Sequence, residues 1–126
     1  MNIAAWYDYK DAIARETSSP RIILVGGSNV LYGLSARQIS EALGVNAINY
    51  GTHAGLTLDY LLYKAKTIAR SGDLVVLALE YEYFEATGVL NSVSFEYIVG
   101  GDPAYISQLS LNQALQCFFS PGLSSW

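Results

Sequence analysis

The fold is decided by the stretch Arg21-Ile22-Ile23-Leu24-Val25-Gly26-Gly27-Ser28-Asn29-Val30-Leu31-Tyr32-Gly33, an apolar run that breaks at two glycines and delivers a serine. The run that ends at Val25 is continuous rather than alternating, which is the pattern of a strand covered by helices on both faces. Glycine has no Cβ, so Gly26 and Gly27 allow a sharp turn and a close approach to a ligand. Open α/β sheets bind ligands beyond the carboxyl ends of their strands. The stretch therefore predicts a central strand that presents Ser28 at the ligand-binding edge.

Further strands and helices are predicted on both sides of this stretch. Apolar runs over residues 45–50 and 74–79 predict two more strands. Helices are expected over residues 3–15, 36–43, 57–70, 91–99 and 103–118. Strands that alternate with helices form right-handed crossovers and a parallel sheet. The sequence therefore predicts a three-layer, doubly wound α/β fold with a short parallel sheet of strand order 2-1-3, followed by C-terminal helices.

Composition and charge argue against several classes of function. The chain has 126 residues, 52% of them hydrophobic, which fits a single domain over residues 1–126. The formal net charge is −4 and the pI is about 4.7, whereas a nucleic-acid partner requires a basic surface. No segment reaches the roughly 18 apolar residues of a membrane span, and charges between Asp8 and Arg15 are unlike a signal peptide. We therefore expect a cytoplasmic protein that binds neither nucleic acid nor membrane.

The residues that can supply chemistry follow the predicted strands. A serine nucleophile such as Ser28 needs a nearby base, usually a histidine, and His53 is the only histidine in the chain. Its position after the second strand places it at the same sheet edge as Ser28. The backbone N–H groups of Ser28 and Gly51 are the expected oxyanion donors. Glu80, after the third strand, could orient the base or bind a cationic group, and Asn29 offers an amide donor.

Each of these residues also has a purely structural interpretation. The turn at Ser28 can simply join a strand to a helix, His53 can bind the backbone of its own turn, and Glu80 can belong to a solvated acidic loop. The turn matches neither a Walker loop, nor the dinucleotide fingerprint, nor the Gly-x-Ser-x-Gly elbow. No cofactor is therefore expected. With one histidine and one cysteine, Cys117, a metal site is not expected either.

The order and spacing of these motifs resemble the SGNH or GDSL hydrolase superfamily, in particular its divergent bacterial branch related to cell-wall and polysaccharide O-acyltransferases. Gly26-Gly27-Ser28-Asn29 followed by Tyr32-Gly33 resembles the first block of that family, and Asn49-Tyr50-Gly51 is similar to the second. Gly72-Asp73 ahead of an apolar strand completes a resemblance over about residues 20–84. The resemblance implies a flavodoxin-like sheet, Ser28 as nucleophile, Gly51 as oxyanion donor and a small acyl or ester ligand.

Two departures from the family pattern decide the functional prediction. Leu79-Glu80-Tyr81-Glu82 stands where the third block of the family carries an asparagine oxyanion donor. The base of the family is a histidine in an Asp-x-x-His block near the C-terminus, and no histidine follows His53. The chain is therefore interpreted as truncated relative to the family, catalytically weak or silent, and acting as an oligomeric or binding module. The alternative is a serine esterase or O-acyltransferase with Ser28 as nucleophile and His53 as base.

The third strand and the tyrosines indicate how such a module would bind. In the order 2-1-3, the strand over residues 74–79 is an apolar sheet edge, which is a liability unless another copy pairs with it or the C-terminal helices cover it. A homodimer through this edge, or through the helix over residues 103–118, is therefore expected. The ten tyrosines predict a half-buried surface that serves as an oligomer interface or a ligand cleft.

Overall fold

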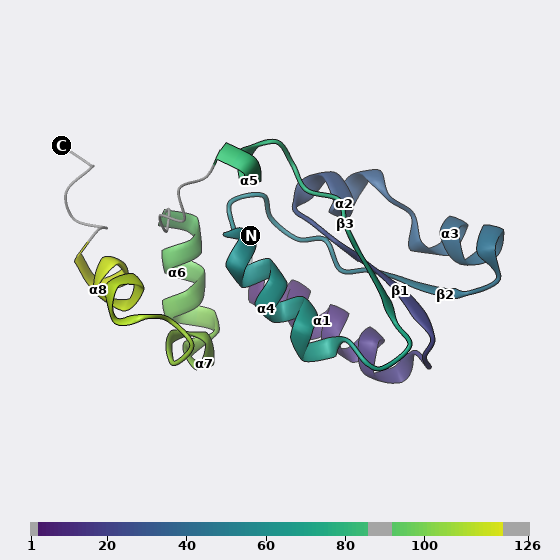
Figure 1. The fold of residues 1–126 in the computed structure, drawn as a ribbon, viewed down its shortest axis with the longest axis horizontal. Coiled ribbons are helices and arrows are strands. Elements are labelled where there is room, and N and C mark those ends of the chain that lie inside the picture. The colour runs from purple at the N-terminus through teal and green to yellow at the C-terminus, as the bar shows by residue number, and fades with distance from the viewer. Residues whose placement is uncertain (1–2, 86–91, 120–126) are drawn as a thin grey trace.

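The computed structural model describes residues 3–85 and 92–119 and shows an α/β fold built on a three-stranded parallel sheet (Figure 1). The central strand β1 (Arg21–Val25) lies between β2 (Asn46–Asn49) and β3 (Leu74–Leu77), which confirms the predicted order. In the parallel register, Ile23 of β1 lies opposite Ile48 on one side and Val75 on the other. The carboxyl ends of all three strands therefore meet at one edge of the sheet.

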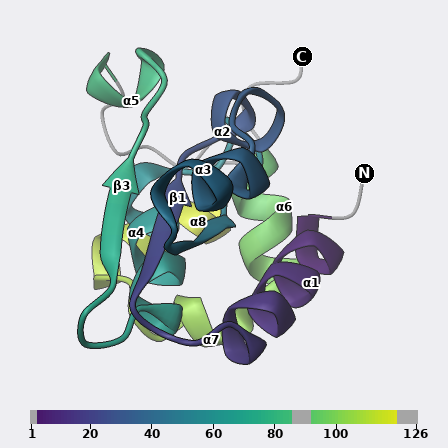
Figure 2. The ribbon, with the colours of Figure 1, turned by 90° about the vertical axis from the view of Figure 1, so that its right-hand side faces the viewer.

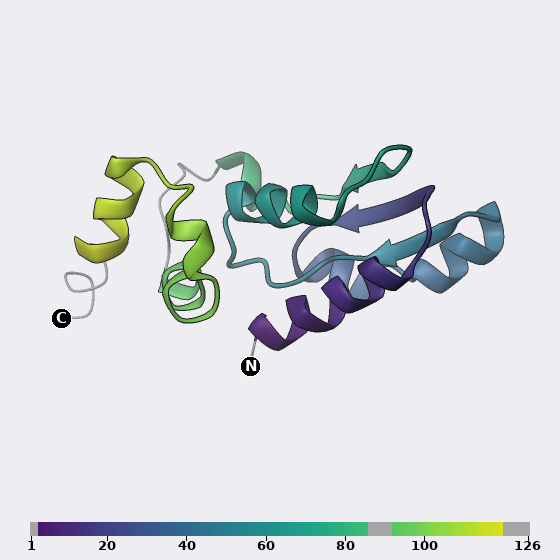
Figure 3. The same ribbon diagram turned by 90° about the horizontal axis from the view of Figure 1, so that it is seen from below.

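Four helices cover the two faces of this sheet. Helices α1 (Ile3–Glu16) and α4 (Leu58–Ile68) lie on one face, whereas α2 (Ser28–Gly33) and α3 (Ala36–Leu43) lie on the other (Figure 1 and Figure 3). The predicted limits of α3 are confirmed, because the Ser35 hydroxyl accepts a hydrogen bond from the Gln38 N–H and Gly44 ends the helix with φ of 65°. These helices complete the predicted three layers.

The C-terminal helices differ in part from the prediction. They are α5 (Glu82–Glu85), α6 (Ser92–Gly101), α7 (Pro103–Ile106) and α8 (Leu111–Phe119). The predicted helix over 91–99 corresponds to α6, although residue 91 lies outside the described residues. The prediction of one helix over 103–118 is wrong. Ser110 starts a new helix there, because its hydroxyl accepts from the Gln113 N–H while the Gln113 side chain accepts from the Ser110 N–H.

Strand β3 is not covered as its apolar sequence predicts. All four of its side chains are exposed, from 36% for Val76 to 58% for Leu74. Figure 2 shows β3 at the margin of the molecule. Within the described residues, α6 packs on α1 and α7 instead of on this strand. The expectation that the C-terminal helices cover this strand is therefore not met by α6 or α7, and no strand among the described residues pairs with the outer edge of β3.

Most of the tyrosines form the core instead of the predicted surface. Six of them are buried: Tyr7, Tyr50, Tyr60, Tyr83, Tyr97 and Tyr105. Their rings pack edge to face, as Tyr60 does against Tyr105 with ring centroids 4.8 Å apart. The hydroxyls find partners inside the protein, since Tyr60 donates to Asp102 at 2.7 Å and Tyr50 donates to Asp11. Internal acceptors thus make tyrosine suitable for a core that joins α1 and α4 to α6 and α7.

Candidate functional site at the carboxyl end of the sheet

The structure brings Ser28 and Glu80 together at the carboxyl ends of β1 and β3. Glu80 Oε1 lies 3.5 Å from Ser28 Oγ and accepts the Asn29 N–H at 3.0 Å, while Oε2 accepts the Gly27 N–H at 3.1 Å. Charge-assisted hydrogen bonds of this kind are about twice as strong as neutral ones. The carboxylate therefore does not orient a histidine here. It binds the turn that presents Ser28, and we call residues 27–29 with Glu80 the Glu80-bound turn.

The two glycines of this turn are required by close backbone approaches. A Cβ on Gly26 would lie 2.4 Å from the Ala78 carbonyl oxygen, and a Cβ on Gly27 would lie 2.8 Å from Ala54 Cα and 2.5 Å from Glu80 Oε1. Real side chains do not occupy such short distances, so only glycine lets the chain after β3 come this near. We predicted that these glycines make room for a ligand. In the structure the room at Gly27 is taken by the Glu80 carboxylate of the chain itself.

Asn29 is also engaged within this region. Its Nδ2 donates to the Ala78 carbonyl at 2.9 Å, and its Oδ1 accepts the Val30 N–H. The side chain therefore ties the start of α2 to the end of β3. One of the two Nδ2 hydrogens is used in the bond to Ala78, so a ligand could receive only the other.

His53 is not hydrogen-bonded to Ser28. Its Nδ1 accepts the backbone N–H of Gly55 at 2.8 Å, which is the structural alternative that the sequence left open. When Nδ1 of a neutral imidazole is an acceptor, Nε2 carries the proton. A base for Ser28 needs a ring nitrogen free to accept, and here the accepting nitrogen is already bonded. The structure therefore shows no assembled Ser28–His53 pair.

Gly51 likewise has a structural task at the end of β2. Its N–H donates to Asn49 Oδ1 at 3.0 Å, so the predicted oxyanion donor is already bonded. A Cβ at this position would lie 2.5 Å from the Leu31 backbone nitrogen. Gly51 is needed because α2 packs directly against this turn.

A buried lysine behind this region was not predicted from the sequence. Lys10 is 8% exposed, and its Nζ donates to the Asn49 carbonyl at 2.6 Å and to Asn49 Oδ1. Burial lowers the pKa of Lys10 to about 8. Asn49 in turn donates to the carbonyls of Val30 and Leu34 at 2.8 Å, which fixes the C-terminal half of α2 to β2. The sequence signal that could have predicted this buried charge is a lysine among the apolar positions of the N-terminal helix.

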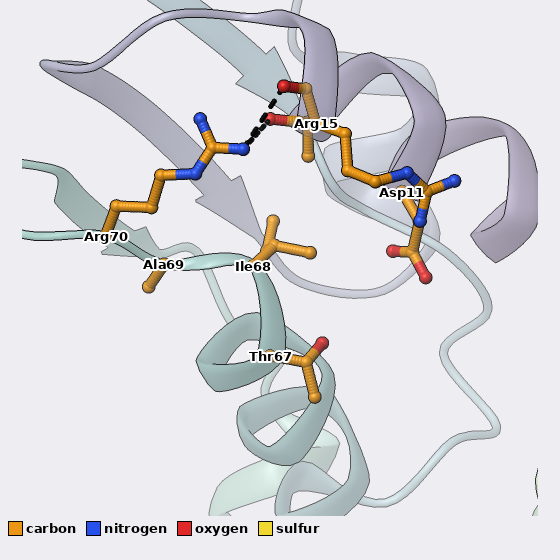
Figure 4. A pocket seen from close by; sticks show the side chains of 7 residues that line it. Asp11, Arg15, Thr67, Ile68, Ala69 and Arg70 are labelled. Atoms are coloured by element: carbon orange, nitrogen blue, oxygen red, sulfur yellow. Dashed lines mark hydrogen bonds between the residues drawn. The ribbon is translucent and has the colours of Figure 1, made fainter.

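The structure also contains a hollow at the opposite end of the sheet. It has a volume of about 270 Å³ and lies between the C-terminal halves of α1 and α4 (Figure 4). Its lining residues are Asp11, Ala14, Arg15, Thr67, Ile68, Ala69 and Arg70. Arg70 donates to the carbonyls of Ala14, Arg15 and Thr17 at 3.2 Å, and so holds the end of α1. None of the predicted site residues contributes to this hollow.

Removal of the Glu80 carboxylate is expected to destabilise the protein. In Glu80→Ala the amides of Gly27 and Asn29 lose their acceptor, which should lower the free energy of unfolding by about 1–3 kcal/mol. Urea denaturation measures the change. The matched control is Glu82→Ala, an exposed neighbouring acid, which should change stability by less than about 0.5 kcal/mol. Equal effects of the two substitutions would contradict the assigned role of Glu80.

The described part of the chain contains neither a cluster of metal ligands nor a membrane-spanning helix. Among residues 3–85 and 92–119, no three His, Cys, Asp or Glu side chains lie close enough together to hold a metal ion, and the Cys117 side chain lies outside what the structure describes. No helix in the same ranges has the length and apolar character needed to cross a bilayer.

Comparison of the chain with family models, with curated proteins and with solved structures gives no match.

Proposed function

We propose that this chain is a catalytically silent, SGNH-like α/β module that acts by assembling with another polypeptide rather than by cleaving or transferring an ester. The observation that carries the proposal is the Glu80-bound turn, in which Glu80 takes the Gly27 and Asn29 amides and contacts Ser28. The uncovered strand β3 supports the assembly role, because an apolar sheet edge is normally paired or covered.

Charge at the turn works against acyl transfer. Attack by Ser28 would create an oxyanion beside the nucleophile, and catalysis requires donors aimed at that new negative charge. Here a carboxylate lies within 3.5 Å of Ser28 Oγ. An oxyanion formed next to Ser28 would lie near this carboxylate, and because like charges repel, Glu80 would raise the barrier that an oxyanion hole lowers. The engaged N–H of Gly51 supports the same conclusion.

The alternative function is that of a serine esterase or O-acyltransferase acting on a small acyl or ester ligand. One contact favours it, since Glu80 Oε1 lies near enough to Ser28 Oγ to accept its proton. In that case Glu80 would take the part of the base that was first assigned to His53. The carboxylate would then have to leave the two amides that it now binds.

Covalent labelling of Ser28 separates the two functions. We expect a fluorophosphonate probe at high concentration to leave the wild-type chain unmodified by mass spectrometry, as it leaves Ser28→Ala, because His53 is bonded to its own turn and the Gly51 N–H is bonded to Asn49. An active serine esterase treated in parallel controls for the probe. An adduct on Ser28 that is absent from Ser28→Ala would overturn the proposed function in favour of the enzyme.

A further inference from the structure

The outer edge of β3 has backbone groups available for pairing. The Ala78 N–H donates to the Val25 carbonyl at 2.9 Å, so Ala78 points toward β1. The direction of the backbone N–H and C=O groups alternates along a strand. Those of Val76 therefore also point toward β1, whereas those of Val75 and Leu77 point outward. Within the described residues β3 is an end strand of the sheet, and no other strand pairs with that side. An outward row of donors and acceptors is a template for a further strand.

We propose that this edge pairs with β3 of a second copy of the chain, in antiparallel orientation about a two-fold axis at Val76. The inference deepens the proposed function by naming the partner, and rests on it. The two sheets would join into one continuous sheet with β3 and its copy at the centre. Such an interface is isologous, because the same surface serves both copies.

The sequence of the edge favours a second copy as the partner. Residues 74–79 read Leu-Val-Val-Leu-Ala-Leu and are all apolar, so antiparallel self-pairing about Val76 sets apolar side chains opposite apolar side chains. Edge strands that avoid self-pairing usually carry lysine, proline or a bulge, and residues 74–77 carry no charge and no proline. The flanking acids do not repel either, because Asp73 is paired with Arg21 and Glu80 is bound to the turn amides.

Strand geometry fixes the register of the pair. A two-fold axis normal to the sheet keeps each side chain on its own face only if the axis passes through a residue that lies opposite itself. With the axis at Val76, the outward groups of Val75 meet those of Leu77 in the partner, and both such pairs form two hydrogen bonds each. Leu74 then lies opposite Ala78. An axis at Val75 would set Leu77 opposite Asp73, which the buried ion pair with Arg21 holds away from an edge ladder.

The uncovered faces of β3 add an energetic reason to pair. Val75 and Leu77 lie opposite Ile23 and Val25, which belong to the core formed with α1 and α4, so these two side chains share the α1 and α4 face. Leu74 and Val76 alternate with them and lie on the α2 and α3 face. Their exposed fractions lie between 36% and 58%. Pairing across the axis removes part of this apolar surface from water on both faces, which favours association.

A cysteine placed on the axis tests the register. In Val76→Cys, the two thiols lie directly opposite in a pair without hydrogen bonds, where Cβ atoms come within about 4.5–5.5 Å and a disulfide is reached with a small adjustment. We expect mild oxidation to convert most of this full-length variant to a disulfide-linked dimer on non-reducing gels. The matched control is Leu74→Cys, which lies on the same face and is more exposed, 58% against 36%, but faces Ala78 of the partner. It should stay uncrosslinked, as should the wild type with its native Cys117.

Crosslinking of Leu74→Cys to the same extent as Val76→Cys would overturn the register, and no crosslinking of either would exclude a second β3 as the partner. Both results leave the fluorophosphonate outcome at Ser28 unchanged. Failure of this inference is therefore distinguishable from failure of the proposed function.

Discussion

Replacement of Asp73 by alanine is expected to lower the free energy of unfolding by roughly 3–5 kcal/mol, because it leaves the charge of Arg21 buried without a counter-charge. The Arg21 and Asp73 side chains are 0% and 1% exposed, and Arg21 Nη2 lies 2.5 Å from Asp73 Oδ2. The carboxylate also accepts the backbone N–H groups of Arg21 at 3.1 Å and Arg70 at 2.9 Å. Asp73 thus fixes the starts of β1 and β3 to each other, and urea denaturation measures its contribution.

The control for Asp73→Ala is the exposed ion pair between Arg37 and Glu41, whose side chains are 76% and 61% exposed. Glu41→Ala should cost less than about 1 kcal/mol, as surface pairs usually do. The interpretation fails if Asp73→Ala is no more destabilising than Glu41→Ala.

The same carboxylate predicts how stability depends on acid. Hydrogen bonding to Arg21 holds the pKa of Asp73 well below its ordinary value of 3.8. Because the pKa is lower in the folded state, the unfolded chain binds the proton first as the pH falls. The stabilisation is therefore complete above about pH 4 and is lost progressively below it. The difference in stability between wild type and Asp73→Ala should shrink from pH 6 to pH 3, as measured by thermal denaturation.

Alkaline solution is expected to unfold the protein cooperatively above about pH 10. Burial is the first cause that raises the pKa of five of the buried tyrosines: Tyr7, Tyr50, Tyr60, Tyr83 and Tyr97. Their hydroxyls stay neutral in the folded protein and ionise at their ordinary pKa near 10 in the unfolded chain. Each such group lowers the free energy of unfolding by about 1.4 kcal/mol per pH unit. Together they remove several kcal/mol within about one pH unit, which is comparable to the stability of a small domain.

The sign of this dependence is specific to the tyrosine core. Between about pH 8 and pH 10.5 the buried Lys10 makes the free energy of unfolding rise with pH, because its lowered pKa means that the unfolded chain binds more protons than the folded protein. The decline therefore begins only where the tyrosines ionise. Circular dichroism and tyrosinate absorbance, followed together in a pH titration, should change in one joint transition for the buried rings. Ionisation of all ten tyrosines with an unchanged dichroism spectrum would refute a tyrosine core.

Local sequence was sufficient to predict the sheet and three of the four helices that frame it, whereas α2 (Ser28–Gly33) was not predicted as a helix. The unbroken run to Val25 and the two glycines after it identify the central strand, since few other structures tolerate that combination. Because that strand is central, a three-stranded sheet has the order β2-β1-β3. The limits of α3 followed from Ser35 and Gly44, because a single residue at each end of a helix is enough to cap it.

Features that depend on tertiary placement could not be predicted in the same way. The apolar sequence of β3 is the same whether or not a helix covers it, and its exposure depends on where the C-terminal helices pack. Sequence placed Glu80 and Ser28 at one edge correctly, but the choice of the turn amides as partners is decided by distances near 3 Å. The buried tyrosines were expected at a surface because their internal acceptors, such as Asp102, are distant in sequence.

The central claim is that the chain acts through the outer edge of β3, and sedimentation velocity of charge variants at Val76 tests it most directly. We predict that the wild type sediments as a dimer, that Val76→Lys and Val76→Glu are each monomeric because like charges lie opposite across the axis, and that their equimolar mixture is again a dimer. Leu43→Lys, a charge on an exposed leucine of α3, should remain dimeric. A monomeric wild type, or Val76→Lys that is as dimeric as Leu43→Lys, would contradict the claim.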